Sequence, residues 1–247
     1  MMPAPAFAGA WPQKAGEGLI INTSLLDRAD NAWDESGQRN SDGFFYKDET
    51  SIFAEYGLTE RYTLVGRIAW QNVRRRNGLN LDSAQGFSAS EIGVRRVVWR
   101  GEKQIVSLQA LALIPGEGEN VSNQPLGDGG QAFEARALWG WSLNDDVFTD
   151  TQIAWRSRNE SDLDEARLDL TLGWRPGERW LLLAQSFSVW SIEPARPGAP
   201  EFEQHKLQMS VGREWGRREY HIGGYITPTG RNSIEERALF ISVWQRF

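Results

Sequence analysis

The last eleven residues constrain the fold of this chain more than any other stretch. The apolar side chains near the end share one side of an extended strand: Leu239, Ile241, Val243 and Phe247. Ser242 and Arg246 fall on the other side, because successive side chains of a strand point to opposite faces. A strand with one apolar face that closes on an aromatic residue predicts a β-protein whose apolar surface faces lipid.

Composition excludes a helical membrane protein and leaves a β-barrel open. No apolar run reaches the length of about 18 residues that a transmembrane helix requires. The mean hydropathy of −0.50 is typical of soluble proteins. A barrel gives a similar average, since each lipid-facing residue alternates with a polar residue that faces the lumen. The absence of Cys excludes a disulfide framework and a thiolate metal site.

Alternation of apolar and polar residues runs through the whole chain. It predicts an all-β fold of about twelve antiparallel strands, each roughly 9–15 residues long, which suffices to cross a bilayer at a tilt. The predicted strands are 17–31, 46–58, 62–75, 88–100, 104–115, 131–143, 147–158, 163–175, 180–192, 204–215, 219–228 and 236–247.

The connections between these segments alternate in length. Short turns lie at 59–61, 101–103, 144–146, 176–179 and 216–218. Mostly longer polar links lie between them, at 32–45, 76–87, 116–130, 159–162, 193–203 and 229–235. Short periplasmic turns and longer extracellular loops are typical of a transmembrane barrel.

The tryptophans favour a membrane protein over a soluble β-sandwich with many core Trp. Indole rings prefer the headgroup region, where the ring is sheltered and its N–H stays hydrated. Most of the twelve Trp lie near predicted strand ends rather than in strand centres. The predicted interface aromatics are Trp70, Trp99, Trp141, Trp155, Trp174, Trp180, Trp190, Trp215 and Trp244.

The stretch from Tyr56 to Leu64, a strand, a tight turn and a strand, resembles the periplasmic hairpins of bacterial outer-membrane β-barrels. Phe247 resembles the terminal residue of the signal that the barrel-assembly machinery reads, although Gln245 departs from the aromatic or apolar residue common there. The chain is also similar to transporter-like barrels, including those of the phenol-degradation (MetA) pathway. This resemblance implies the bacterial outer membrane, with lipid and lipopolysaccharide as its surroundings.

The inward faces of the predicted strands carry charges of both signs. The candidate lumen residues are Arg67, Glu134, Arg136, Asp150, Arg156, Glu165, Arg167 and Asp169. Two interpretations are open. Acids and arginines of neighbouring strands can pair into a structural network, or they can line a water-filled path and set its selectivity.

The N-terminal residues stand apart from the barrel domain predicted at 17–247. Small residues at Ala6 and Ala8 resemble the cleavage region of a secretory signal, although an apolar core segment is missing. Residues 1–16 are therefore interpreted as a signal-peptide remnant or a flexible tail.

The sequence supports a passive role best: a narrow channel, or the barrel component of an envelope transport or export system. A second hypothesis is a non-conducting anchoring barrel that binds an envelope protein through the loops 116–130 and 193–203. A third, a lipid or peptide hydrolase, would need His205 or His221, but no nucleophile–base motif is visible. The chain is thus predicted not to be an enzyme, and no cofactor or metal is expected.

Arginines at 74–76 raise the question of a nucleic-acid partner. The chain carries a net charge of −6, and a short basic run at a loop base fits lipopolysaccharide phosphates better. No nucleic-acid partner is therefore expected.

Overall fold

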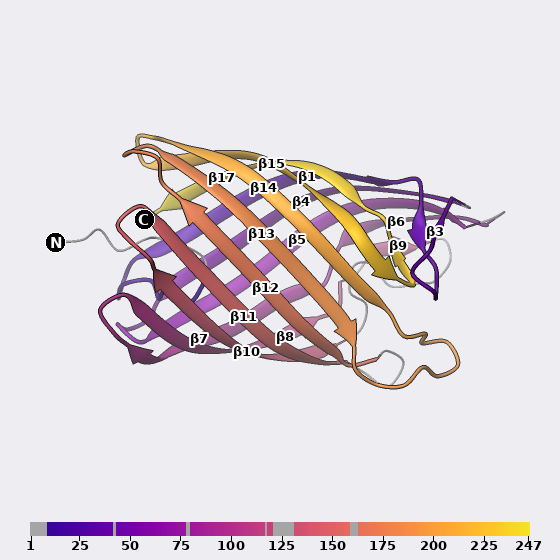
Figure 1. The fold of residues 1–247 in the computed structure, drawn as a ribbon, viewed down its shortest axis with the longest axis horizontal. Coiled ribbons are helices and arrows are strands. Elements are labelled where there is room, and N and C mark those ends of the chain that lie inside the picture. Colours follow the sequence, from indigo (N-terminus) through magenta and orange to yellow (C-terminus); the bar gives the residue numbers. More distant parts are fainter. Residues whose placement is uncertain (1–8, 42, 78–79, 117, 121–130, 159–162) are drawn as a thin grey trace.

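The computed structural model describes residues 9–41, 43–77, 80–116, 118–120, 131–158 and 163–247. Within these residues, twelve long strands pair antiparallel into a closed barrel (Figure 1). Neighbours in the chain are neighbours in the sheet, and β1 pairs with β17 to join the two ends of the chain. The predicted all-β antiparallel barrel is confirmed. The described residues contain no helix that is long and apolar enough to span a membrane.

The long strands lie close to the predicted segments. Their bounds are β1 Gly18–Ala29, β4 Gly43–Gly57, β5 Tyr62–Asn77, β7 Ser90–Arg100, β8 Gln104–Ile114, β10 Ala132–Ser142, β11 Val147–Arg158, β12 Glu165–Trp174, β13 Trp180–Ser191, β14 Glu203–Trp215, β15 Arg218–Arg231 and β17 Arg237–Arg246. Short turns join them at one end of the barrel, which is the periplasmic end in this class.

The opposite end carries additional short strands, and here the structure differs from the sequence prediction. β2 (Ala32–Trp33) pairs with β3 (Arg39–Asn40) and with β16 (Ser233–Ile234). The predicted polar link 76–87 contains β6 (Asn80–Phe87), which pairs with β5 and with β9 (Gly118–Asn120). A hairpin outside the lipid needs no apolar face, so polar composition concealed this strand. Residues 121–130 and 159–162 of the predicted loops lie outside the described residues.

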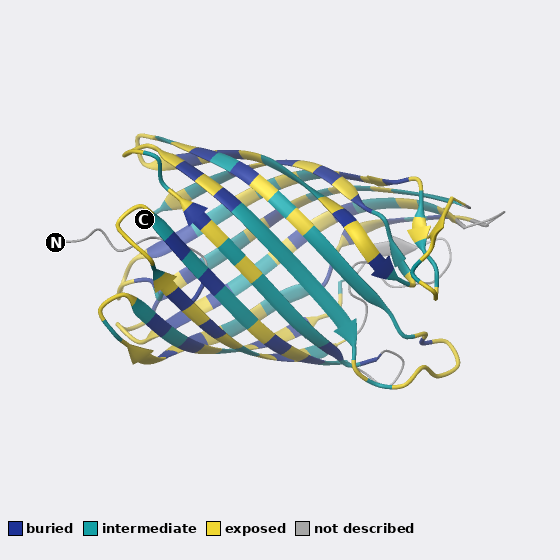
Figure 2. Cartoon of the chain, in the orientation of Figure 1, coloured by how far each residue is buried: buried dark blue, intermediate teal, exposed yellow. Residues whose placement is uncertain are grey.

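Burial alternates along the strands, which gives the checkered wall of Figure 2. In β10, for example, Phe133, Trp139 and Trp141 are exposed on the outside, whereas Glu134 and Leu138 are buried on the inside. Large apolar side chains that stay exposed on one continuous outer surface are the arrangement expected of a lipid-facing wall.

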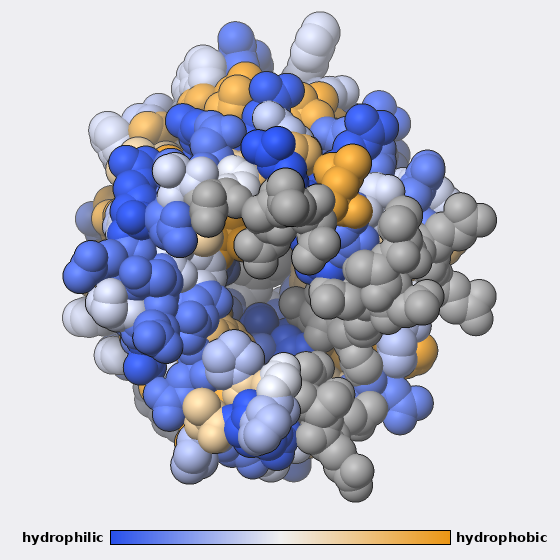
Figure 3. Space-filling model, turned by 90° about the vertical axis from the view of Figure 1, so that its right-hand side faces the viewer, coloured by the Kyte–Doolittle hydropathy of each residue, from blue (hydrophilic) through white to orange (hydrophobic). Residues whose placement is uncertain are grey.

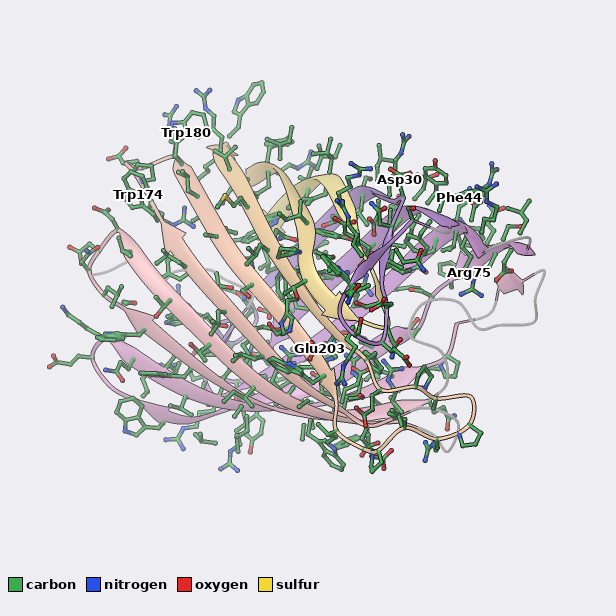
Figure 4. The ribbon with its side chains drawn as sticks, turned by 45° about the vertical axis from the view of Figure 1, so that its right-hand side comes forward. Asp30, Phe44, Arg75, Trp174, Trp180 and Glu203 are labelled. Atoms are coloured by element: carbon green, nitrogen blue, oxygen red, sulfur yellow. The ribbon has the colours of Figure 1, made fainter. Side chains whose placement is uncertain are left out.

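The outer wall carries most of the predicted interface tryptophans. Trp174 and Trp180 lie together at the short-turn rim (Figure 4). The prediction for Trp244 is wrong: its ring stacks on His221 at 4.4 Å and packs against the interior cluster of Phe148, Leu181 and Leu183. Residues 243–247 alternate, so Trp244 shares the inward face of Ser242 rather than the outward face of Phe247.

Two irregularities adjust the register without breaking the barrel. The β7–β8 ladder shifts between Val97 and Trp99, which marks a bulge near the short-turn rim. The β14–β15 ladder shifts between His205 and Leu207 near the opposite end. Arg96, an outward residue in an otherwise apolar row, places its guanidinium 5.6 Å from the centre of the Tyr62 ring.

Ile153→Arg tests which surface faces lipid. Ile153 is 62% exposed in the middle of β11, on the outer wall. A charge at the bilayer midplane is expected to destabilise the folded barrel by about 2–4 kcal/mol, against about 0–1 kcal/mol near an interface. Leu143→Arg, beside a short turn, is the matched control. Unfolding by guanidinium in liposomes, followed by Trp fluorescence, measures both; equal losses at the two positions would contradict the membrane placement.

Candidate functional site: the barrel lumen

The eight candidate lumen residues all lie on the inner wall, and most of them gather on β10, β11 and β12. Glu134 is fully buried and forms ion pairs at 2.8 Å with both Arg136 and Arg156. Arg136 also pairs with Asp169 and donates a hydrogen bond of 2.6 Å to Gln152. Side chains from three adjacent strands thus form one network, in which a buried carboxylate is flanked by two guanidinium groups.

A second acid extends this network toward the long loops. Glu165 pairs with Arg158 at 2.6 Å and with Arg167 at 2.9 Å. Each of these acids pairs with two arginines, so ion pairs hold the side chains on this side of the wall in place. This arrangement fits the first interpretation of the sequence, a structural network. The part that these residues play in selectivity stays a prediction.

The described end of the N-terminal segment lies inside the barrel. The Ala10 N–H donates to Asp150 Oδ2 at 2.7 Å on β11, and Ser107 Oγ of β8 donates to the Ala10 carbonyl at 2.6 Å. Gln13 Nε2 donates to Glu55 Oε2 at 2.7 Å on β4. These contacts fall on neighbouring strands of the ring, from β4 to β11, so residues 10–13 lie inside the lumen against this part of the wall. The sequence predicted only a signal remnant or flexible tail here.

A buried ion pair holds this segment against the wall. Arg95 of β7 donates to the Gly9 carbonyl and forms an ion pair of 2.8 Å with Glu55. The side chains of Arg95 and Glu55 are both almost completely buried. Gln13 and the Gly9 carbonyl of the segment each bind one member of this pair, so the segment is held where the two buried charges meet.

Trp11 fills the space between the segment and the wall. Its ring meets Phe148 edge-on, with centroids 5.9 Å apart, and packs against two inner apolar clusters. Gly140 of β10 makes room for it, because a Cβ there would lie 2.6 Å from the indole ring. The interior near the short turns is therefore packed around this segment rather than open.

The half of the lumen toward the long loops contains a cavity. This cavity of about 400 Å³ is lined by residues of β4, β5, β6 and β14 and by the segment before β17. Figure 3 looks onto this end, where mostly hydrophilic side chains surround the mouth. The charged residues that line the cavity are Lys47, Glu49, Arg67, Arg75, Asp82, Lys206 and Glu236.

Opposite charges pair along the cavity wall. Lys206 pairs with Glu236 at 2.6 Å, and Lys47 lies 3.8 Å from Glu236 and 3.5 Å from Asp27. Arg67 forms an ion pair of 2.5 Å with Glu49. Among the described residues that line the cavity, four are basic and three acidic, so the wall is close to balance.

Sequence reasoning found Arg67 but did not select Lys47, Glu49 or Glu236. The signal was present for the first two, which alternate with outward residues in phase with Glu55. Glu236 lies just before the last strand, where alternation gives no direction. No sequence pattern predicts the position of the N-terminal segment inside the barrel, because only tertiary contacts place it there.

The two histidines do not form one site. His221 lies inside, hydrogen-bonded to Glu219 at 2.8 Å and stacked on Trp244. His205 lies on the outer wall, with Nδ1 3.0 Å from Ser188 Oγ and its ring 5.2 Å from Trp190. In the part of the chain that the structure describes, no group of three or more His, Asp or Glu side chains would hold a metal ion.

Comparisons place this geometry among known proteins. The sequence matches no protein family and no curated protein. The COG4313 outer membrane channel from Pseudomonas putida F1 superposes with a TM-score of 0.78 and 14% identity over 99% of both chains. The translocator domain of autotransporter NalP from Neisseria meningitidis gives 0.60 and 11%, over 99% of this chain and 90% of that one. The KdgM porin, solved with disordered oligogalacturonate, gives 0.55 and 8%, over 93% and 99%.

At these identities the likeness establishes the fold. Together with the apolar outer wall, it defines the class: the chain is a bacterial outer-membrane β-barrel. The structures that share the fold include channels and porins.

Glu134→Ala tests the wall network. Removing the shared acid leaves Arg136 and Arg156 without their common partner inside the wall. Loss of one member of a buried pair is expected to cost about 3–5 kcal/mol of unfolding free energy. Chemical unfolding in detergent micelles measures it. Glu235→Ala, which breaks an exposed pair with Arg39, is expected to cost only about 0–1 kcal/mol. Similar losses of unfolding free energy in both variants would contradict a buried network that stabilises the wall.

Proposed function

We propose that the chain is a narrow outer-membrane channel with a charged outer vestibule and a constriction made by its own N-terminal segment. The observation that carries this proposal is the position of residues 10–13 inside the lumen, where Trp11 fills space at the short-turn end and a cavity of about 400 Å³ lies toward the long loops. A barrel of about twelve strands lies between small barrels filled by side chains and large open porins. The segment therefore sets the width of the path.

The vestibule gives the channel its weak selectivity. Ion selectivity in a pore follows the charges that line it. Four basic and three acidic residues line the described cavity wall, and Asp27 supplies a further acid beside Lys47. With charges this close to balance, we expect the pore to discriminate by size more than by charge.

Trp11→Ala tests the constriction. Loss of the indole ring removes the packing of the segment against Phe148 and opens the space beside Gly140. Single-channel conductance in a planar bilayer is expected to rise, and deletion of residues 9–13 to raise it several-fold. Trp215→Ala removes an exposed outer-wall indole and serves as the control, with no expected change. Unchanged conductance in both the Trp11 variant and the deletion would rule out the constriction.

Two variants with opposite expected shifts of the reversal potential test whether the vestibule sets ion selectivity. Lys206→Gln is expected to shift the reversal potential in a salt gradient toward cation preference, and Glu49→Gln toward anion preference. Arg213→Gln, on the outer face of the same strand as Lys206, should leave it unchanged. Equal potentials in all three variants would show that ions do not pass this cavity.

The non-conducting anchoring barrel gives the opposite result. A folded protein that stays silent, and stays silent after deletion of residues 9–13, would favour it. The loop 193–203, where Arg196 and Ala199 form an isolated β-bridge, then belongs to the contact surface. We also propose that the protein is not an enzyme. His221 is hydrogen-bonded inside the barrel and His205 lies on the outer wall, so the two histidines do not share a site.

A further inference from the structure

A row of arginines crosses the outer wall near the long-loop rim. In the register of the sheet, Arg28 of β1 lies opposite Arg237 of β17 on one side and opposite Tyr46 of β4 on the other. Tyr46 in turn lies opposite Arg74 of β5, and Arg76 follows one outward step further along that strand. Four adjacent strands thus present basic and aromatic side chains to the outside.

The aromatic rings hold two of these arginines in place. The guanidinium carbon of Arg28 lies 5.5 Å from the Tyr46 ring centre, and that of Arg76 lies 5.2 Å from the Phe44 ring centre. Figure 4 shows Phe44 on this part of the wall, at the opposite end from Trp174 and Trp180. Stacked guanidinium groups keep their N–H donors free for a ligand.

The positive charge of this row is only partly neutralised by the protein. Arg237 pairs with Asp30, but among the described residues Arg28, Arg74 and Arg76 form no ion pair. Like charges directly opposite each other on neighbouring strands are destabilising. The juxtaposition of Arg28 and Arg237 is therefore favoured by an external anion.

Below the row the wall becomes apolar on β17 and β1, whereas the same lower row is polar on β4 and β5. Leu26 lies opposite Leu239, one outward step from Arg28 and Arg237, and these leucines are 59% and 70% exposed. Asp48 is the acidic neighbour in this lower row, opposite Leu26 on β4. A basic row above an apolar surface on β1 and β17 matches an amphiphile with anionic groups at its head and acyl chains beneath.

We propose that this surface, Arg28, Tyr46, Arg74, Arg76 and Arg237, binds lipopolysaccharide of the outer leaflet through the phosphates of its lipid A. Guanidinium groups pair with phosphate through two parallel hydrogen bonds, which makes Arg the preferred residue for such sites. The proposal needs only the membrane placement of the barrel. It is independent of whether the lumen conducts.

Native mass spectrometry of the folded protein in detergent, titrated with bisphosphorylated lipid A, tests the site. The double variant Arg28→Gln with Arg76→Gln is expected to weaken binding about 30-fold, since each arginine near an anionic lipid contributes about fivefold. Asp48→Asn removes the acidic neighbour and should strengthen binding.

The opposite rim supplies a matched control. Arg96 and Arg213 stack on Tyr62 and Trp180 at 5.6 and 5.0 Å, as Arg28 and Arg76 stack on their rings. Arg96→Gln with Arg213→Gln should leave lipid A binding unchanged, and heat-modifiable gel migration confirms folding of every variant. Equal losses in the two double variants would overturn the site. Equal affinity for dephosphorylated lipid A would overturn phosphate recognition, and equal affinity for phosphatidylglycerol would overturn the choice of lipid.

Discussion

Closure of the sheet is the constraint on which the rest of this structure depends. In lipid, an unpaired backbone N–H or C=O has no water to bond, so a spanning sheet must leave no edge. The pairing of β1 with β17, and of β4 with both β1 and β5, completes the ring of hydrogen bonds. Once the ring is closed, alternation assigns every side chain either to lipid or to the lumen. A shift of one residue would turn the charged face outward, so the register is strongly specified.

This assignment determines which side chains line the lumen. Charged residues that cannot face lipid gather inside, where Glu134 and Glu165 are each held between two arginines. On the other side, Lys47, Lys206 and Glu236 pair around a cavity. The exclusion of charges from lipid therefore produces both a wall crosslinked by ion pairs and a cavity lined by charged residues. The N-terminal segment adds a third element, since it satisfies Asp150 and Glu55 with its own donors and closes much of the remaining space.

Much of the fold and part of the site followed from the sequence. The strand bounds agree within a few residues because lipid on one face enforces a strict period of two. The inward direction of Arg67, Glu134 and Asp169 followed from the same period. β6 was missed because the β5–β6 hairpin lies beyond the lipid, where polar residues satisfy both faces. Trp244 lies near a strand end, as interface tryptophans do, but its phase with Ser242 turns the ring into the lumen.

The sequence by itself determined the class of the protein: alternating strands, unequal connections and outward apolar residues allow a barrel in the outer membrane and little else. Only the tertiary structure decided which charges meet, where the cavity lies and where residues 10–13 run. The physical reason is the separation in sequence between the residues that interact. Alternation is a local property that each strand carries alone, whereas the pairing of Glu55 with Arg95, or the fit of Trp11 beside Gly140, exists only after the ring has closed and brought distant strands together.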